Sequence, residues 1–395
     1  MTKKLLKIEP FTLNKKITVP PSKSMAHRFL ICSALCEGES VIHNIDLSDD
    51  ILATAECLRN IGAEIKIDSR TAYVKGINLS DFRSCTLNCV ESGSTLRFSI
   101  PLCLAVGKRI TLTGSERLFS RPLDVYEKIC ADNGFVFSKG KNSLTVFGNL
   151  SAGKYIIQGN LSSQFISGLL FVLPLLDGKS EIEITEPVES SPYIDMTVRA
   201  LSLFGINISR KENTIFINGN QKYSPAVLSV DGDYSIASVL DAFNFAGGNV
   251  ELCGLDPDSV QGDRKYKEYF EMLSDGFCEI NLSDCPDLAP VLFVVSALNH
   301  GAKFTGTHRL RFKESERDKA MKTELEKFGI KAELEENRLT VFASEIKKPS
   351  EIICGHNDHR IVMALTLLLS ITGGTISDSD AVKKSFPDFF KEILQ

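Results

Sequence analysis

Hydroxyl, acidic and basic side chains gather at six points where a polar residue comes directly before an apolar helical pattern. The six patterns begin at Ser22, Ser92, Ser162, Asp233, Asp287 and Asn357. The start of a helix presents N–H groups that have no partner within the helix, together with a partial positive charge, so it favours anions. Lys23 and Arg28 accompany the first start, and Arg360 accompanies the last. Brought together, these groups predict a pocket for a substrate that carries several negative charges.

The elements that would position these groups repeat along the chain. The helix starts recur about every 70 residues, with one shorter interval, which is typical of repeated copies of one folding unit. A second pattern, in which a helix is followed by glycine and an apolar strand, recurs with a similar period. Its glycines are Gly62, Gly134, Gly205, Gly276 and Gly329, and glycine is favoured just past a helix end. We expect the fifth unit to be shortened, and a strand around residues 6–11 to complete the sixth.

Each unit is predicted to run strand, helix, strand, helix, strand, which indicates the α/β class. In the first unit we expect strands at 16–19, 40–45 and 63–67, with helices at 24–36 and 50–60. Six units group most simply as three plus three. The predicted domains are residues 14–225, and residues 1–13 together with 226–395. Because the chain would cross between them twice, we expect a hinge and a cleft that holds the ligands.

Composition restricts the class of protein. A chain of 395 residues with 43% hydrophobic and 24% charged residues is typical of globular proteins with more than one domain. A net charge of −5 argues against a general nucleic-acid partner. The apolar stretch 169–176 is too short to span a membrane, and the N-terminus has no apolar signal region. Eleven cysteines without a CxxC pair predict reduced thiols in a cytoplasmic protein.

A set of short motifs, in this order and in register with the repeat, resembles the 5-enolpyruvylshikimate-3-phosphate synthase family. The motifs are Pro21-Ser22-Lys23-Ser24 with Arg28; Gly93-Ser94 with Arg97; Arg121-Pro122; Ser162-Ser163-Gln164; Ser190-Ser191-Pro192-Tyr193; Pro286-Asp287; Lys313-Glu314 with Arg317; Asn357-Asp358-His359-Arg360; and Lys384 before Phe386-Pro387-Asp388. The resemblance implies a two-domain inside-out α/β barrel of six units, three per domain. It also implies a monomer without metal or organic cofactor. The reaction would transfer the enolpyruvyl group of phosphoenolpyruvate to the 5-hydroxyl of shikimate-3-phosphate and release phosphate.

The resemblance assigns one set of residues to shikimate-3-phosphate. They are Lys23, Ser24, Arg28, Ser162, Ser163, Gln164, Ser190, Tyr193, Asp287 and Lys313. It places the phosphate of this substrate at Ser162 and Ser163, and the ring of Tyr193 against its carbocycle. Spacing alone leaves a simpler possibility open, in which Ser24, Ser162 and Ser163 only cap helices.

A second set is assigned to phosphoenolpyruvate. It comprises Lys23, Gly93, Arg121, Gln164, Arg317, Arg360 and Lys384. Arginine suits this task because its planar fork binds carboxylate or phosphate with two hydrogen bonds. His359 lies beside this clamp in the sequence and would order it. Without the resemblance, Lys23 reads as a solvated charge and His359 as a structural residue.

The chemistry needs a base for the hydroxyl proton, an acid for the methylene carbon and cations for the departing phosphate. By resemblance the catalytic residues are Asp287 as base, Glu314 as proton donor and Lys23 as the group that assists phosphate departure. The sequence leaves open which of the two carboxylates carries which proton. Taken alone, Asp287 reads as a helix cap and Glu314 as part of a salt-bridged helix start on the surface.

Three residues depart from the family pattern: Glu91 and Arg309 stand where asparagine is frequent, and Phe98 stands where proline is frequent. Two other functions remain as alternatives. One is the related enolpyruvyl transferase acting on UDP-N-acetylglucosamine, although residues 114–122 lack the cysteine typical of that enzyme. The other is a non-catalytic anion-binding repeat protein, which would not need the two acidic residues. A nucleotide-dependent kinase is disfavoured because no G-x-x-x-x-G-K-[ST] motif occurs.

Overall fold

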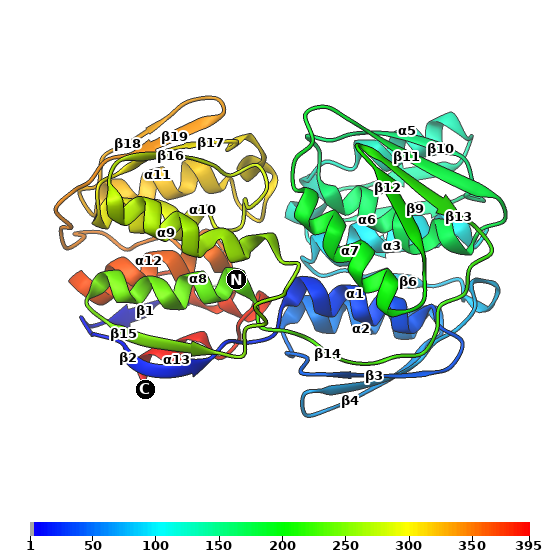
Figure 1. Ribbon diagram of the computed structural model, residues 1–395, viewed down its shortest axis with the longest axis horizontal. Coiled ribbons are helices and arrows are strands. Elements are labelled where there is room, and N and C mark those ends of the chain that lie inside the picture. Colours follow the sequence, from blue (N-terminus) through cyan, green and yellow to red (C-terminus); the bar gives the residue numbers. More distant parts are fainter. Residues whose placement is uncertain (1–3) are drawn as a thin grey trace. The chain divides into compact units, whose positions relative to one another are not determined.

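The computed structural model describes residues 4–395 as an α/β protein of short strands and helices (Figure 1). The chain forms two compact units. One is Pro21–Asp231, and the other joins the segment ending at Pro20 to Gly232–Gln395. We refer to them below as the 21–231 unit and the 232–395 unit.

The bounds of the two units differ from the predicted domains because two strands have other partners than we expected. Strand β2 (Asn14–Thr18) pairs in parallel with β15 (Asn249–Cys253). Strand β14 (Val227–Ser229) pairs in parallel with β3 (Glu39–His43). Residues 14–18, which we expected to open the first repeat, therefore belong to the 232–395 unit. An alternating strand pattern does not identify the strand that will pair with it.

Three four-stranded sheets with the same topology make up the 21–231 unit: two parallel strands followed by an antiparallel hairpin. The first sheet has the order β14, β3, β5 (Thr71–Lys75), β4 (Glu64–Asp68). The second is β6 (Thr86–Asn88), β7 (Ile110–Thr113), β9 (Ser143–Phe147), β8 (Val136–Lys139). The third is β10 (Lys154–Gln158), β11 (Lys179–Thr185), β13 (Thr214–Asn218), β12 (Ile208–Lys211). The prediction missed the second strand of each hairpin, which is the last strand of the repeat along the chain: β5, β9 and β13.

Helices fill the interior of this unit. The first helix of each repeat is buried along almost its whole length: α1 (Lys23–Ala34), α3 (Gly93–Ala105) and α6 (Ser163–Val172). Their apolar side chains surround the helix, which is typical of a helix in a core rather than at a surface. The second helices are α2 (Asp49–Ile61), α4 (Glu116–Ser120), α5 (Asp124–Asp132) and α7 (Ser191–Leu203). The strands alternate between buried and exposed residues, so one face of each sheet is exposed.

The 232–395 unit has only one four-stranded sheet among its described residues. Its order is β16 (Cys278–Asn281), β17 (Ala302–Thr305), β19 (Arg338–Val341), β18 (Ala332–Leu334). The other two sheets are pairs, β15 with β2, and β1 (Leu6–Ile8) with β20 (Gly374–Ile376). The pairing of β1 with β20 confirms that the N-terminal strand completes the sixth repeat.

The helices of the 232–395 unit follow the same arrangement. Those that open the repeats are buried: α8 (Tyr234–Ala242), α10 (Ala289–Leu298) and α12 (His359–Thr372). The others are α9 (Tyr266–Asp275), α11 (Arg317–Lys327) and α13 (Phe389–Leu394). Two short 3₁₀ helices matter below, η5 (His308–Phe312) and η6 (Ser379–Lys384).

The shortened repeat is the fourth and not the fifth, so this prediction was wrong. After α9, Gly276 leads directly into β16, which is the first strand of the fifth sheet. In the first, second, third and fifth repeats the corresponding glycine leads into the first strand of that repeat's own hairpin, as Gly62 leads into β4. The fourth repeat therefore lacks the hairpin. The glycine pattern marks a helix end, but it does not say to which sheet the next strand belongs.

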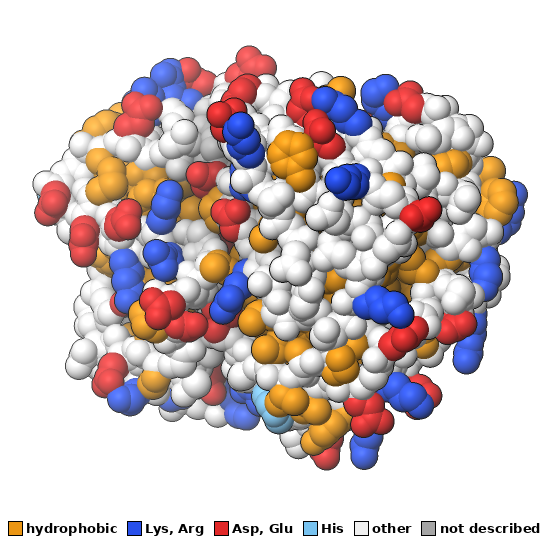
Figure 2. Space-filling view, turned by 45° about the vertical axis from the view of Figure 1, so that its right-hand side comes forward, with side chains coloured by type: hydrophobic (Ala, Val, Ile, Leu, Met, Phe, Trp, Pro, Cys, Tyr) orange, Lys and Arg blue, Asp and Glu red, His pale blue; other side chains and the backbone are white. Residues whose placement is uncertain are grey.

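Charged side chains of both signs are interspersed over the face of the molecule in Figure 2. Within residues 4–395, no helix combines the length and the apolar character needed to cross a membrane. All eleven cysteines are free thiols, and most are buried.

Candidate functional site

In the 21–231 unit, serine side chains cap all three buried helices at the predicted positions. The hydroxyls of Ser22, Ser92 and Ser162 accept hydrogen bonds from the N–H groups of Met25, Thr95 and Gln164, at 3.4, 3.2 and 3.4 Å. The capping interpretation is thus right for Ser162. It is wrong for Ser24, which lies inside α1, one turn before Arg28.

Arg28 is the most firmly held of the predicted cations in this unit. Its guanidinium donates to the hydroxyl of Thr197 at 2.9 Å, to the carbonyl of Ser24 at 2.7 Å and to the carbonyl of Tyr193 at 2.8 Å. Burial lowers the pKa of Arg28 to about 10, so it stays charged at neutral pH. These bonds tie α1 to α7 and bring together three residues assigned to shikimate-3-phosphate.

Lys23 is not a solvated charge. Its ammonium lies 2.8 Å from a carboxylate oxygen of Asp50, and the two side chains are only 13% and 11% exposed. Asp50 stands in the first turn of α2, where its charge also complements the helix dipole. No local pattern predicts this pair, because the two residues are 27 positions apart in the chain.

A buried chain of hydrogen bonds fixes α1, α2 and α3 relative to one another. The ring Nδ1 of His27 lies 2.8 Å from the hydroxyl of Thr54, which lies 2.6 Å from that of Thr95. Thr95 in turn donates to the hydroxyl of Ser92 at 2.7 Å. Burial, together with Lys23 and Arg28, lowers the pKa of His27 well below its usual value. This series of hydrogen bonds therefore holds the three helices in position, and the histidine at its end is neutral.

Three of the residues assigned to phosphoenolpyruvate, Gly93, Arg121 and Gln164, lie close together. A β-carbon built at Gly93 would lie 2.8 Å from a terminal nitrogen of Arg121 and 3.2 Å from one of Arg97. Arg97 donates to the side-chain oxygen of Gln164 at 2.9 Å, and the amide nitrogen of Gln164 donates to Ser94 at 2.9 Å. Arg97, which the motif contains but the assignment omitted, is thus part of this cluster.

The other predicted residues of this unit stand at or near the starts of α6 and α7. Ser163 is the first residue of α6 and is buried. Ser190 is buried and adopts a left-handed conformation with a φ of 57°, directly before α7. The structure links α6 to α7 through Ser167 and Thr197, whose hydroxyls lie 2.7 Å apart.

In the 232–395 unit, three cations converge on one carboxylate. Asp287 accepts hydrogen bonds from Lys313 at 3.1 Å, from Arg317 at 2.9 Å and from Arg360 at 2.9 Å. These cations come from three different places in the chain: the end of η5, the start of α11 and the start of α12. Asp287 does not cap α10, whose cap is Leu288 without a side-chain hydrogen bond.

The protonation of this cluster follows from its charges. Burial alone would raise the pKa of Asp287, but Arg360, Lys313 and Arg317 outweigh it and hold that pKa well below its usual value. Burial lowers the pKa of Lys313. Asp287 opposes this shift by favouring the charged ammonium, whereas Arg317 and Arg309 lower the pKa of Lys313 further. Asp287 is therefore a charged carboxylate in this state of the protein.

Arg317 connects the two predicted catalytic carboxylates. Its side chain is 1% exposed and donates to Asp287, to Glu314 at 2.6 Å and to Asp358 at 2.8 Å. Glu314 is therefore not part of a surface salt bridge, although its side chain keeps 18% exposure. Asp358 also caps α12 by accepting the N–H of Arg360 at 3.0 Å. The sequence motif contained Asp358, but we had assigned it no role.

The remaining residues of the predicted clamp surround the loop before α12. The ammonium of Lys384, at the end of η6, donates to the carbonyl of Asn357 at 2.6 Å. His359 is buried as the first residue of α12. Asp263, which the sequence analysis overlooked, lies near this cluster, and burial together with Asp287 raises its pKa to about 6.

Two of the residues that depart from the family pattern contact the cluster residues. The ring of Phe98 lies 5.5 Å from the guanidinium of Arg28 and packs edge-on against Phe171. Arg309 is buried in η5 and contributes to the low pKa of Lys313. Phe98 therefore places an aromatic ring, instead of the frequent proline, against a cation that the family resemblance assigns to shikimate-3-phosphate.

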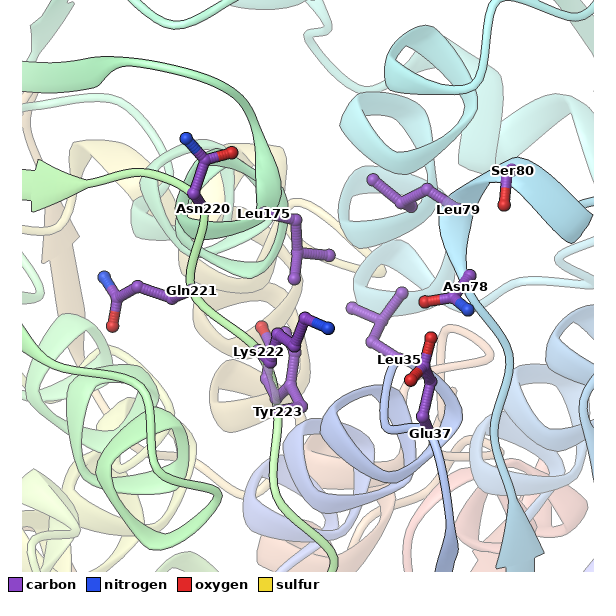
Figure 3. Close-up of a pocket in the computed structure, with 10 residues that line it drawn as sticks. All are labelled: Leu35, Glu37, Asn78, Leu79, Ser80, Leu175, Asn220, Gln221, Lys222 and Tyr223. Carbon is purple, nitrogen blue, oxygen red and sulfur yellow. The ribbon is translucent and has the colours of Figure 1, made fainter.

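A pocket of about 530 Å³ in the 21–231 unit lies away from these clusters (Figure 3). It is lined by Leu35, Glu37, Asn78, Leu79, Ser80, Leu175, Asn220, Gln221, Lys222 and Tyr223. None of the predicted site residues lines it. The predicted residues instead form two groups, one in each unit.

Comparison with known proteins gives a consistent result. A family model described as EPSP synthase (3-phosphoshikimate 1-carboxyvinyltransferase) matches residues 9–393. A protein of Clostridium novyi (strain NT) named 3-phosphoshikimate 1-carboxyvinyltransferase is 40% identical, over 98% of this chain and 96% of its own. A protein of the same name from Clostridium kluyveri is 37% identical, over 99% and 96%.

A solved EPSP synthase from Acinetobacter baumannii has the same fold, with a TM-score of 0.78 at 22% identity, covering 99% of this chain and 97% of that one. The motifs recognised in the sequence all lie within the matched range. This chain is a member of the EPSP synthase (3-phosphoshikimate 1-carboxyvinyltransferase) family.

Proposed function

We propose that this chain transfers the enolpyruvyl group of phosphoenolpyruvate to the 5-hydroxyl of shikimate-3-phosphate, the reaction for which its family is named. The observation that carries the proposal is the convergence of Lys313, Arg317 and Arg360 on Asp287. Two buried arginines and a partly buried lysine around one carboxylate suit a ligand that brings its own negative charges. Family membership supports the reaction, and the contacts of individual residues support the roles given below.

Phosphoenolpyruvate is the ligand that this cation cluster suits. Its carboxylate and phosphate would take the place of Asp287 as hydrogen-bond acceptors for Arg317 and Arg360. In the 21–231 unit, Arg121 next to Gly93 offers a further guanidinium, and Gln164 is held in place by Arg97 and Ser94. Lys23, presented by Asp50, would stabilise the phosphate as it departs.

Shikimate-3-phosphate would bind to the starts of the buried helices in the 21–231 unit. Ser162 and Ser163 open α6, where a phosphate gains from both hydroxyls and backbone N–H groups. Arg28 and Tyr193 are already joined through the Tyr193 carbonyl, so the cation and the ring keep a fixed relation. Ser24 and Ser190 would add hydroxyl donors, and Lys313 would contact the same substrate from the 232–395 unit.

The chemical step needs two proton transfers. The 5-hydroxyl oxygen adds to C2 of phosphoenolpyruvate, its proton passes to a base, and the methylene carbon gains a proton to become a methyl group. Loss of a methyl proton then restores the double bond as the C2–O bond to phosphate breaks. We assign the base to Asp287 and the acid to Glu314. When substrate anions engage Arg360 and Lys313, Asp287 loses the interactions that keep its pKa low and becomes a stronger base.

Measuring phosphate release tests the proposal directly. The protein should release phosphate from phosphoenolpyruvate when shikimate-3-phosphate is present, and it should not do so with UDP-N-acetylglucosamine. Turnover with the nucleotide sugar alone would assign the chain to the related enolpyruvyl transferase. Binding of both anions without turnover would leave a non-catalytic binding protein. We further propose that the enzyme acts as a monomer in the cytoplasm without a cofactor for this reaction.

A further inference from the structure

Three side chains with different metal-binding chemistry meet at a place that the proposed reaction does not use. Atoms of Glu324, Cys354 and His356 that could bind a metal ion all lie within 4.8 Å of one another. Glu324 stands on the buried side of α11. Cys354 and His356 lie in the loop between Ile353, which forms a bridge with Ile376, and the start of α12.

The carboxylate of Glu324 is oriented so that one oxygen faces this cluster. Its Oε2 accepts hydrogen bonds from Lys327 at 2.9 Å and from the N–H of Cys354 at 2.8 Å. Its Oε1 lies 3.0 Å from Nε2 of His356. Burial would raise the pKa of Glu324, but His356, Lys327 and the Cys354 N–H together lower it. The hydrogen bonds to Oε2 therefore hold the carboxylate in an orientation in which its other oxygen, Oε1, points at the ring of His356.

The thiol and the imidazole are held close to this oxygen by the backbone. The sulfur of Cys354 accepts the N–H of His356 at 3.4 Å, and its thiol lies 3.6 Å from a carboxylate oxygen of Asp378. The two residues reach the same side of the loop because His356 adopts a left-handed φ of 51°. Hydrogen bonds to the sulfur and to the far carboxylate oxygen are the type of outer-shell support that metal ligands receive.

We propose that Oε1 of Glu324, the sulfur of Cys354 and a ring nitrogen of His356 bind a zinc ion, with water or Asp378 in the fourth position. A mixed set of sulfur, nitrogen and oxygen suits zinc, whereas magnesium and calcium prefer oxygen alone. In a tetrahedral zinc site such ligand atoms lie roughly 3.3–3.6 Å apart. The side chains of Cys354 and His356, which are half-buried, would need to move by about 1 Å to bring the three ligand atoms to these distances. The thiol gives up its proton when the zinc binds.

The position of this site gives it a structural role near the proposed reaction centre. Glu324 lies on the same helix as Arg317, about two turns further along. The loop that carries Cys354 and His356 continues to Asn357, whose carbonyl accepts Lys384, and to Asp358, which holds Arg317. Zinc would therefore fasten α11 to the loop that positions these cations. The site is independent of the proposed function, and its test measures metal binding and not turnover.

The experiment uses the full chain, freed of metal by a chelator, with zinc and cobalt(II) as probes. We expect one zinc per chain and, with cobalt, a thiolate-to-metal charge-transfer absorption that zinc abolishes. Cys354→Ser should remove that absorption, and Cys354→Ser and His356→Gln should each weaken zinc binding more than about 100-fold. Both loop residues are only half buried, so these variants should fold, which circular dichroism verifies. Glu324 is 1% exposed, so its replacement is a less suitable test.

Cys278→Ser is the matched control, because Cys278 is another half-buried thiol of the same unit and is not part of the cluster. It should leave both zinc affinity and the cobalt spectrum unchanged. Zinc binding that survives Cys354→Ser would overturn the proposal, as would a cobalt spectrum without a thiolate band. Less than one zinc per folded chain at saturation would overturn it too.

Discussion

Replacing each of the two proposed catalytic carboxylates by its amide tests whether Asp287 and Glu314 act in proton transfer. The substitutions Asp287→Asn and Glu314→Gln keep the side-chain shape and remove the charge and the proton-transfer function. General acid or base groups typically contribute about 10²–10⁴-fold to the rate. We therefore expect both variants to bind the two substrates and to lose turnover by that order.

The structure predicts different stability costs for the two variants. Asp287 is the shared partner of Lys313, Arg317 and Arg360, so its loss leaves buried cations without their counter-charge. Removing one member of such a buried group costs roughly 3–5 kcal/mol. Glu314 pairs with Arg317 and is partly exposed, and losing a hydrogen bond to a charged group costs about 1.5–3 kcal/mol. Asp287→Asn should therefore lower the free energy of unfolding more than Glu314→Gln does.

Single-turnover kinetics and urea unfolding of each variant are the assays. Glu279→Gln is the control in the same unit, because Glu279 pairs with Lys303 while its side chain is 54% exposed; it should cost below about 1 kcal/mol and leave turnover intact. Solvent exchange of the methylene protons of phosphoenolpyruvate should depend more on Glu314 than on Asp287. The opposite dependence would exchange the two roles. A folded variant that turns over at the parent rate would refute a catalytic role for that carboxylate.

Four further substitutions test other parts of the site. Gly93→Ala should weaken phosphoenolpyruvate binding with little loss of stability, because the new β-carbon meets the movable end of Arg121 at 2.8 Å; titration with an unchanged affinity would contradict this. Arg121→Ala should chiefly weaken the binding of phosphoenolpyruvate, by roughly 1.5–3 kcal/mol, because a charge-assisted hydrogen bond is lost. Ser163→Ala should chiefly weaken the binding of shikimate-3-phosphate, by a smaller amount, because a neutral hydrogen bond is lost. Equal losses for both ligands in both variants would argue against two subsites. In the folded parent the carboxyl of Asp263, with a pKa of about 6, keeps its proton at pH values where the unfolded chain has already lost it. The parent is therefore destabilised as pH rises from about 4 to about 6, and the Asp263→Asn variant should become more stable relative to the parent by about 3 kcal/mol in total. Urea unfolding of both proteins across this pH range measures the difference, and a constant difference would refute the assignment.

Features fixed by local sequence could be predicted from it. Ser22, Ser92, Ser162 and Asp233 all cap helices as expected, because a cap depends on residues two or three positions apart. The expectation was wrong at Asp287, whose carboxylate is occupied by cations from distant segments. No local pattern could reveal that competition.

Features that depend on distant segments could not be predicted from spacing. The exchange of β2 and β14 between the units depends on which sheet edge each strand reaches. The partner of Lys23 lies 27 residues away on another helix. Asp358 stood in a recognised motif, yet its role became clear only from its bonds to Arg317 and to the start of α12. The family resemblance named the residues of the site, and the structure shows what holds most of them.

The carboxylates around Arg317 also explain how a protein can keep an anion site before its substrate arrives. Arg317 and Arg360 are buried and Lys313 is partly buried, so without a negative charge the three cations would repel one another strongly. Asp287 supplies that charge and is also the proposed base. A substrate that binds these cations would remove the interactions that keep the pKa of Asp287 low. Substrate binding would thus raise this pKa and make Asp287 a stronger base, as the reaction requires. Binding and activation of the base are then two consequences of one exchange of partners.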